Sequence, residues 1–133
     1  MEETALVGRR CKALVARQFW LDGRLVDEFC AIFLEDDHKD VWKLYLDDED
    51  YSWKWEPEQE MPKPGVTISD ADLSYPHTDM FIRFPLRDHV IGSLTEGDLG
   101  TCARATIRFS NGQALVLDFE YATERTTVRL ERT

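Results

Sequence analysis

The chain has 133 residues, of which 43% are hydrophobic and 32% charged, and its formal net charge is −10 at neutral pH. This composition is typical of a soluble globular domain, and a chain of this length buries about two thirds of its unfolded surface without a metal or disulfide. The acidic balance disfavours direct nucleic-acid binding, which usually depends on a net basic surface. We expect a single domain over residues 1–133.

The sequence gives no sign of membrane insertion or export. The longest unbroken apolar run, residues 29–34, has six residues, against about 20 for a membrane-spanning helix. The first residues, Met1-Glu2-Glu3, are acidic where a secretory signal is basic. Three cysteines without a CxxC spacing indicate free thiols in a reducing compartment. We therefore expect a cytoplasmic protein without membrane contact.

The first expected hairpin turns at Asp22-Gly23, after residues 1–7, which are expected to be helical or frayed. A slip of one residue would set Phe19 against Asp27, so the two-residue turn is favoured. The expected pairs of that turn are Trp20–Leu25, Phe19–Val26 and Arg17–Glu28. The second strand continues through residues 29–34, which are apolar at every position and predict a strand covered on both faces.

The acidic segment, residues 35–60, carries eleven acidic residues against three lysines and holds three of the four tryptophans. Its centre is expected to be a hairpin with strands at 41–46 and 51–56. The expected loop is Asp47-Asp48-Glu49-Asp50. The expected pairs put the apolar side chains on one face: Leu46–Tyr51, Leu44–Trp53 and Trp42–Trp55. This face lines either the core or an interface, and the same register sets Lys43 beside Lys54, a mild repulsion.

The middle of the chain changes character, because all five prolines fall between residues 57 and 85. Residues 57–100 are therefore expected to be an irregular, proline-rich connection. Within it we expect a short strand at 80–84 and brief helical turns at 69–72 and 88–94.

The strongest local signal is the alternation of apolar and polar residues on both sides of Ser110-Asn111-Gly112. A two-residue Asn-Gly turn would put the apolar sets of the two strands on opposite faces. A three-residue loop with Gly112 left-handed in a G1 bulge is therefore predicted. The expected pairs are Ile107–Leu115, Ala105–Leu117, Ala103–Phe119 and Arg104–Asp118. A third strand at 125–131 would place Thr126, Val128 and Leu130 on one face.

About seven strands joined mostly by short turns indicate a mainly β, antiparallel fold. The hairpins around 22–23, 47–50 and 110–112 fit either a β-barrel or a β-sandwich, and the pattern does not separate the two. An exposed edge strand would also let two copies pair across a two-fold axis, so a homodimer is compatible with the sequence.

No phosphate loop, nucleophile elbow or zinc-binding spacing is present, and no catalytic residue, metal or cofactor is expected. Two imidazoles and a carboxylate, from His77, His89 and Asp79, define the alternative of a metal-dependent enzyme, although their spacing matches no established metal motif. The three cysteines are expected to be small core residues rather than nucleophiles. They are Cys11, Cys30 and Cys102.

The acidic and aromatic hairpin favours a non-enzymatic protein that binds a basic protein surface, as an inhibitor or neutralising partner. Carboxylates would steer the partner, and large rings would anchor it. The expected contact residues are Asp36, Asp37, Asp47, Asp48, Glu49, Asp50, Trp53 and Trp55. A second hypothesis is a small-molecule carrier or sensor that holds an apolar ligand among the tryptophans.

Overall fold

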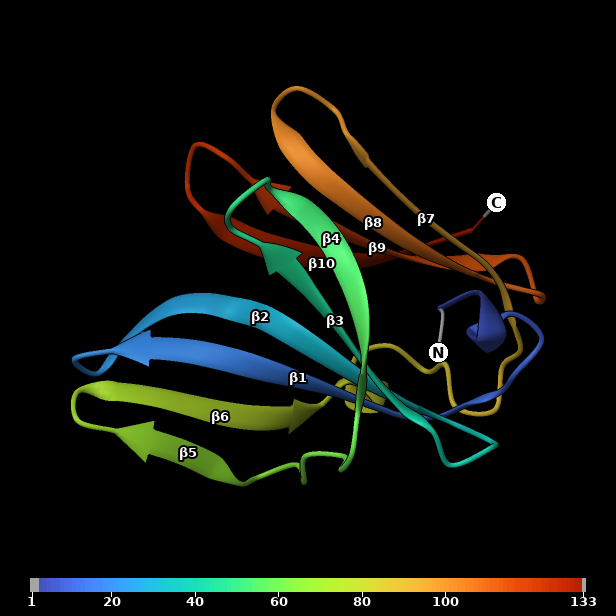
Figure 1. The fold of residues 1–133 in the computed structure, drawn as a ribbon, viewed down its shortest axis with the longest axis horizontal. Coiled ribbons are helices and arrows are strands. Elements are labelled where there is room, and N and C mark those ends of the chain that lie inside the picture. The colour runs from blue at the N-terminus through green and yellow to red at the C-terminus, as the bar shows by residue number, and fades with distance from the viewer. Residues whose placement is uncertain (1–2, 133) are drawn as a thin grey trace.

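The structure, a computed structural model, describes residues 3–132 and contains two antiparallel β-sheets (Figure 1). The six-stranded sheet has the order β4-β3-β2-β1-β6-β5, and the four-stranded sheet has the order β10-β9-β8-β7. The first sheet contains β1 (Cys11–Leu21), β2 (Arg24–Asp36), β3 (Val41–Asp47), β4 (Ser52–Glu58), β5 (Thr67–Asp70) and β6 (Leu73–Asp79). The second contains β7 (Ile91–Asp98), β8 (Cys102–Phe109), β9 (Gln113–Glu120) and β10 (Arg125–Arg132). Two short 3-10 helices are η1 (Glu3–Leu6) and η2 (Met80–Ile82).

The mainly β prediction is confirmed, with ten strands instead of about seven. β2 lies against β10, and β4 lies against β7 and β8, so the two sheets face each other. This arrangement fits the predicted β-sandwich, and residues 3–132 form no closed barrel. Over the same residues, no helix has the length and apolar character needed to cross a membrane. β5 is an exposed edge strand, and pairing between two copies stays a prediction.

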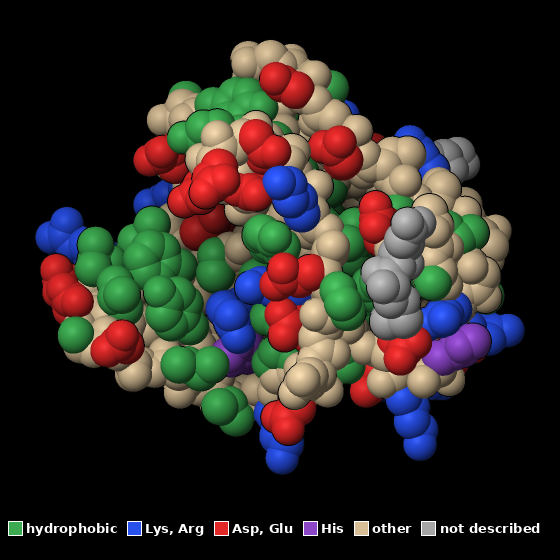
Figure 2. All heavy atoms as spheres, in the orientation of Figure 1, with side chains coloured by type: hydrophobic (Ala, Val, Ile, Leu, Met, Phe, Trp, Pro, Cys, Tyr) green, Lys and Arg blue, Asp and Glu red, His purple; other side chains and the backbone are tan. Residues whose placement is uncertain are grey.

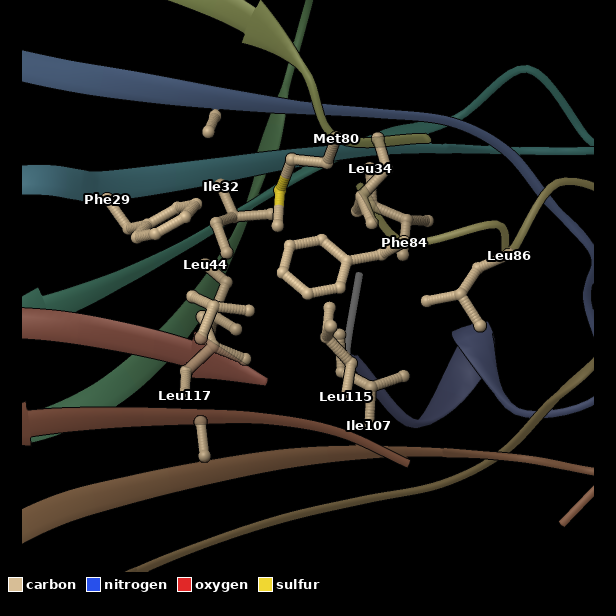
Figure 3. Close-up of a cluster of buried hydrophobic side chains, with 14 of the residues drawn as sticks. Phe29, Ile32, Leu34, Leu44, Met80, Phe84, Leu86, Ile107, Leu115 and Leu117 are labelled. Atoms are coloured by element: carbon tan, nitrogen blue, oxygen red, sulfur yellow. The ribbon is translucent and has the colours of Figure 1, made fainter. Parts of the chain in front are cut away.

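The main hydrophobic core lies between the two sheets, where buried side chains from both meet (Figure 3). The six-stranded sheet contributes Ile32, Leu34 and Leu44, and the four-stranded sheet contributes Ile107, Leu115 and Leu117. Met80, Phe84 and Leu86 enter the same core from the segment between β6 and β7. Each fully buried aliphatic side chain stabilises the fold by about 1.5–3 kcal/mol, so this layer holds the two sheets together.

The apolar run at 29–34 is covered on both faces, as predicted. Ile32 and Leu34 belong to the main core, whereas Ala31 and Phe33 join Val15 in a second buried cluster. Partly buried Tyr45 and Met61 pack against this second cluster. The segment that follows β4 therefore covers part of the outer face of the six-stranded sheet.

The β8–β9 hairpin has the predicted register. Ile107 pairs with Leu115 and Arg104 with Asp118. Gly112 has a φ of 89°, and its N–H donates to the carbonyl of Phe109. Glycine adopts this left-handed conformation without the steric cost that a side chain would bring, so the three-residue loop is preferred. β10 continues the sheet; of the three residues predicted on one face, Thr126 and Val128 are buried and Leu130 is half-buried.

The β3–β4 hairpin is shifted by two residues from the predicted register. The pairs are Leu46–Trp53, Leu44–Trp55 and Trp42–Pro57. The loop is set by Asp47, whose carbonyl accepts a hydrogen bond from Tyr51 and whose carboxylate caps the N–H of Glu49. The shift removes the expected repulsion between lysines, because Lys43 now pairs with Glu56.

The β1–β2 hairpin agrees with the prediction only next to its turn. Trp20 pairs with Leu25 as expected, but Phe19 pairs with Asp27 and Arg17 with Ala31. Two bulges separate these pairs, and they absorb the extra residues of the longer second strand. The predicted pairs Phe19–Val26 and Arg17–Glu28 are therefore wrong. One consequence is that Asp27 faces the other sheet, where it accepts hydrogen bonds from the backbone N–H and the hydroxyl of Thr126.

The proline-rich middle is more regular than expected. Residues 69–72, predicted as a helical turn, belong to the β5–β6 hairpin, and most of 88–94 belongs to β7 instead of a helical turn. The strand predicted at 80–84 is absent; residues 80–82 form η2, which starts where the carboxylate of Asp79 accepts a hydrogen bond from the N–H of Phe81. Side-chain capping of free N–H groups favours a helical turn over an extended strand here.

Candidate functional site

Two of the predicted contact residues, Asp36 and Trp53, lie inside the protein. Asp36 is 1% exposed, and its Oδ2 accepts hydrogen bonds from Arg9 at 2.7 Å and from the indole of Trp42 at 3.1 Å. Its Oδ1 accepts from the backbone N–H groups of His38 and Asp40. Burial alone would raise the pKa of Asp36, but these hydrogen bonds outweigh it and hold the pKa below its usual value. Asp36 therefore fixes the turn between β2 and β3.

The predicted aromatic face is mostly core. Trp42 is fully buried, and Trp53 is buried with its indole N–H donating to the carbonyl of Ala103 across the two sheets at 2.8 Å. Trp55 is half-buried and lines a surface pocket of about 290 Å³. Trp53 lines the same pocket, whereas Trp42 lies in the core, and the apolar-ligand hypothesis stays a prediction.

The loop carboxylates divide into two kinds. Asp47 and Asp50 both pair with Lys54, at 2.7 and 3.2 Å. The hydrogen bond from Lys54 lowers the pKa of Asp47, and hydrogen bonds from Ser52 and Lys54 lower that of Asp50. The side chains of Asp48 and Glu49 are exposed and make no hydrogen bond or ion pair with any residue between 3 and 132. These two remain available to a partner.

Asp37 is exposed, but it does not join the loop. It lies before β3, whereas Asp48 follows β3, and a seven-residue strand separates positions by about 20 Å. Its carboxylate accepts a hydrogen bond from the N–H of Arg10. The predicted contact residues at 36–37 and at 47–50 are thus at opposite ends of one strand.

The tip of the β3–β4 hairpin instead lies beside the β7–β8 and β9–β10 turns (Figure 1). We call the surface formed by these three tips the acidic end. Its acidic residues are Asp47, Asp48, Glu49, Asp50, Asp98 and Glu124. Figure 2 shows red side chains gathered over these tips, with few blue ones among them. Asp98 and Glu124 were not predicted, because only the pairing of the two sheets brings them to the loop.

Three aromatic rings hold the tips together. Tyr51, from the β3–β4 loop, stacks on Phe119 with ring centroids 6.2 Å apart and meets Tyr121 edge to face at 5.9 Å. Tyr121 donates a hydrogen bond to the carboxylate of Asp98 at 3.0 Å. Tyr51 is 45% exposed, so the acidic end presents an aromatic surface, although the sequence predicted tryptophans in this role.

The residues of the metal-enzyme alternative have separate structural roles. His77 is buried; its Nδ1 lies 2.7 Å from the carbonyl of Val66, and its Nε2 accepts a hydrogen bond from Arg17 at 3.0 Å. Asp79 caps η2, and His89 contacts Asn111. These three side chains do not form a group of potential ligands in residues 3–132.

Cys102, Asp118 and Glu120 do form such a group, with ligand atoms within 4.8 Å of one another. However, the two oxygens of Asp118 accept hydrogen bonds from Arg104 and Arg129 at 2.7–2.9 Å. These arginines lower the pKa of Asp118, while burial raises that of Cys102. Two guanidinium groups thus already bind both oxygens of Asp118.

The cysteines are not activated for nucleophilic chemistry. Burial raises the pKa of Cys11 to about 12 and that of Cys30 to about 11. A thiol with such a pKa carries almost no thiolate at neutral pH, and the thiolate is the reactive form. The described cysteines are free, and Cys11 and Cys102 are buried.

Comparisons of this chain with protein-family models, curated proteins and solved structures found no match. Within residues 3–132, the acidic end combines carboxylates that have no internal partner with exposed aromatic surface, and it is the candidate binding surface.

Proposed function

We propose that this protein binds a second protein that carries a basic surface, and that the acidic end is the contact surface. The supporting observation is that the carboxylates of Asp48, Glu49 and Glu124 have no hydrogen bond or ion pair within the described chain. A lysine or arginine of the partner pairs with them without displacing an internal cation. Buried carboxylates such as Asp36 cannot act in this way.

Charge at the acidic end acts first on the rate of encounter. A cluster of one sign raises the association rate with an oppositely charged surface by about 10- to 1000-fold, and the effect falls steeply with salt. The field extends over a Debye length of about 8 Å at physiological ionic strength, which reaches beyond a single side chain. Asp47, Asp50 and Asp98 strengthen this field although internal donors already bind them.

Aromatic area then slows dissociation. Tyrosine is enriched among the residues that dominate binding energy at interfaces, and Tyr51 is exposed at the centre of the acidic end. In this proposal Tyr51 takes the anchoring role first assigned to Trp53 and Trp55. A basic surface that otherwise binds phosphate groups, as in a nuclease, is the type of surface that such an inhibitor or neutralising partner covers.

The test uses the intact protein as bait in a native lysate, with identification of captured proteins and measurement of Kd for a purified partner. We expect a stoichiometric basic protein whose affinity decreases with salt. The triple variant Asp48→Lys, Glu49→Lys and Glu124→Lys should weaken binding by at least about tenfold, or about 1.4 kcal/mol. It leaves Asp47 and Asp50 in place, because they maintain the hairpin loop.

A second triple variant provides the control for net charge. Glu60→Lys, Asp70→Lys and Asp72→Lys change the charge by the same amount at exposed sites outside the acidic end. We expect this variant to bind within about twofold of the unmodified protein. Failure to capture a basic partner, or equal loss in both triple variants, would contradict the proposal, since a general charge effect needs no defined surface.

A further inference from the structure

A pocket at the centre of the acidic end has aromatic and anionic walls and no cationic one. It has a volume of about 370 Å³ and is lined by Asp50, Tyr51, Asp98, Tyr121 and Glu124. Two tyrosine rings, inclined at 84°, form one corner of this pocket. Three carboxylates surround that corner, so every charged group in the lining is negative.

The hydrogen bonds of the lining leave one carboxylate, that of Glu124, and the hydroxyl of Tyr51 available to a ligand within residues 3–132. The hydroxyl of Tyr121 donates to Asp98, which also accepts from the N–H of Gly100. Asp50 accepts from Ser52 and Lys54, while the carboxylate of Glu124 makes no contact of this kind with residues 3–132. The carboxylates of the lining would repel an anionic ligand. A neutral ligand with a hydrogen-bond donor would find only one carboxylate, that of Glu124, that is not already bonded within residues 3–132.

The backbone holds two of the lining residues in an unusual conformation. Tyr51 and Glu124 both have a φ of 54°, in the left-handed region that bulky residues rarely adopt. Each follows a turn in which its N–H donates to a carbonyl four residues earlier, Asp47 for Tyr51 and Glu120 for Glu124. Asp22, Lys39, Ala71 and Asp88 adopt the same left-handed conformation in other turns, so the conformation places the two side chains at the pocket without marking them as functional.

The geometry points to a binding site for the alkylammonium head of a lysine side chain. The electron-rich faces of tyrosine rings attract such a cation, and carboxylates at the rim neutralise its charge. Guanidinium is planar and prefers stacking or a two-pronged carboxylate pair, whereas a corner of two perpendicular rings fits a rounded ammonium group. The ammonium belongs to the basic partner proposed above, so this assignment depends on the proposed function.

The test measures binding of small ammonium probes by NMR, at constant ionic strength, from the amide shifts of residues around 51, 121 and 124. The probes are blocked lysine, blocked trimethyllysine and blocked norleucine, which is neutral and of similar length. We expect saturable millimolar binding of both ammonium probes, as is usual for so few atoms, and none of norleucine. Comparison of the first two distinguishes an unmodified from a methylated lysine.

Tyr51→Gly should reduce the affinity for the ammonium probes by at least about tenfold, because it removes one wall and keeps the positive φ. Asp22→Gly is the matched control, since Asp22 has a φ of 51° in the distant β1–β2 turn. Equal shifts with norleucine, or unchanged probe binding by Tyr51→Gly, would overturn the lysine site. If a basic partner binds Tyr51→Gly normally but binds the lysine-substituted triple variant weakly, the lysine site and the anchoring role of Tyr51 are wrong, while the acidic end stands as the contact surface. If the ammonium probes bind as expected but no protein partner is found, the lysine site stands while the proposed function is wrong.

Discussion

The two acidic turns at the ends of β3 have similar sequences but use their carboxylates in opposite ways. In the turn at 36–40, Asp36 is buried and accepts four hydrogen bonds, two from side chains and two from the backbone. In the loop at 48–51, which the sequence predicted at 47–50, the side chains of Asp48 and Glu49 are exposed and bind nothing within residues 3–132. A run of acidic residues therefore does not by itself define a binding surface.

The difference comes from the donors that the fold supplies. Arg9, from the segment before β1, reaches Asp36 and Asp40 with one guanidinium nitrogen, at 2.7 Å in each case. At the opposite end of β3, Lys54 is engaged by Asp47 and Asp50, so the outer carboxylates remain without a cation. The first turn is part of the internal structure, and the second is free to interact.

The largest expected effect that tests this contrast is the loss of stability in Asp36→Asn. The amide cannot accept from both donor pairs, because one of its two terminal atoms is an NH₂ group facing other donors. It also leaves Arg9 paired only with Asp40. We expect the free energy of unfolding to fall by about 3–5 kcal/mol, measured by urea denaturation.

Asp48→Asn is the matched control at the other turn, and its unfolding free energy should stay within about 0.5 kcal/mol of the unmodified protein. If Asp36→Asn costs as little as Asp48→Asn, the two turns are equivalent and the contrast between them is wrong.

A smaller effect is expected when another buried aspartate, Asp27, is changed to asparagine. Its Oδ1 accepts from the N–H groups of Phe29 and Thr126, and its Oδ2 accepts from the hydroxyl of Thr126. An asparagine keeps the first two bonds, and its NH₂ group can donate to the hydroxyl, which also accepts. We expect Asp27→Asn to change stability by less than about 1 kcal/mol at pH 7.

The pH dependence of the stability difference between Asp27→Asn and the unmodified protein gives a sharper test. Burial raises the pKa of Asp27, although hydrogen bonds from Phe29 and Thr126 oppose this shift. A raised pKa in the folded state contributes stability below the unfolded pKa of about 3.9, and this contribution is lost as pH rises through the folded pKa. The stability of Asp27→Asn relative to the unmodified protein should therefore increase between about pH 4 and 7. A constant difference across this range would show that the carboxylate is not penalised by burial.

The hydrophobic pattern of the sequence predicted the strand register of one hairpin and failed at another. At β8–β9, the alternatives differed by one residue, which exchanges the faces of the sheet, so hydrophobic pattern and Gly112 together determined the pairing. At β3–β4, the true register differs by two residues, which keeps every side chain on its face. The pattern could not separate these registers, and the choice depends on the capping by Asp47 and the left-handed Tyr51.

The candidate site was harder to predict for a related reason. Burial of Asp36 depends on Arg9, which is 27 positions away, and the pocket at the acidic end joins Tyr51 to Tyr121 across the two sheets. A single sequence without a structure does not indicate such long-range pairs. The exposed loop carboxylates were local features, and Asp48 and Glu49 are predicted contact residues that are exposed and whose side chains bind nothing else within residues 3–132.

A small net change in stability is expected at the tip itself, for Tyr51→Gly, because two opposing effects nearly cancel. Glycine removes the cost of a positive φ, about 1 kcal/mol, and loses ring contacts with Phe119 and Tyr121 of similar size. We expect the unfolding free energy to stay within about 1 kcal/mol of the unmodified protein, while affinity for ammonium probes falls. Asp22→Gly, which loses no ring, should be equally stable or slightly more stable. A loss above about 2 kcal/mol for Tyr51→Gly would mean that the ring is held as part of the core, as Asp36 is, and that the tip is not the free surface that distinguishes it from the other acidic turn.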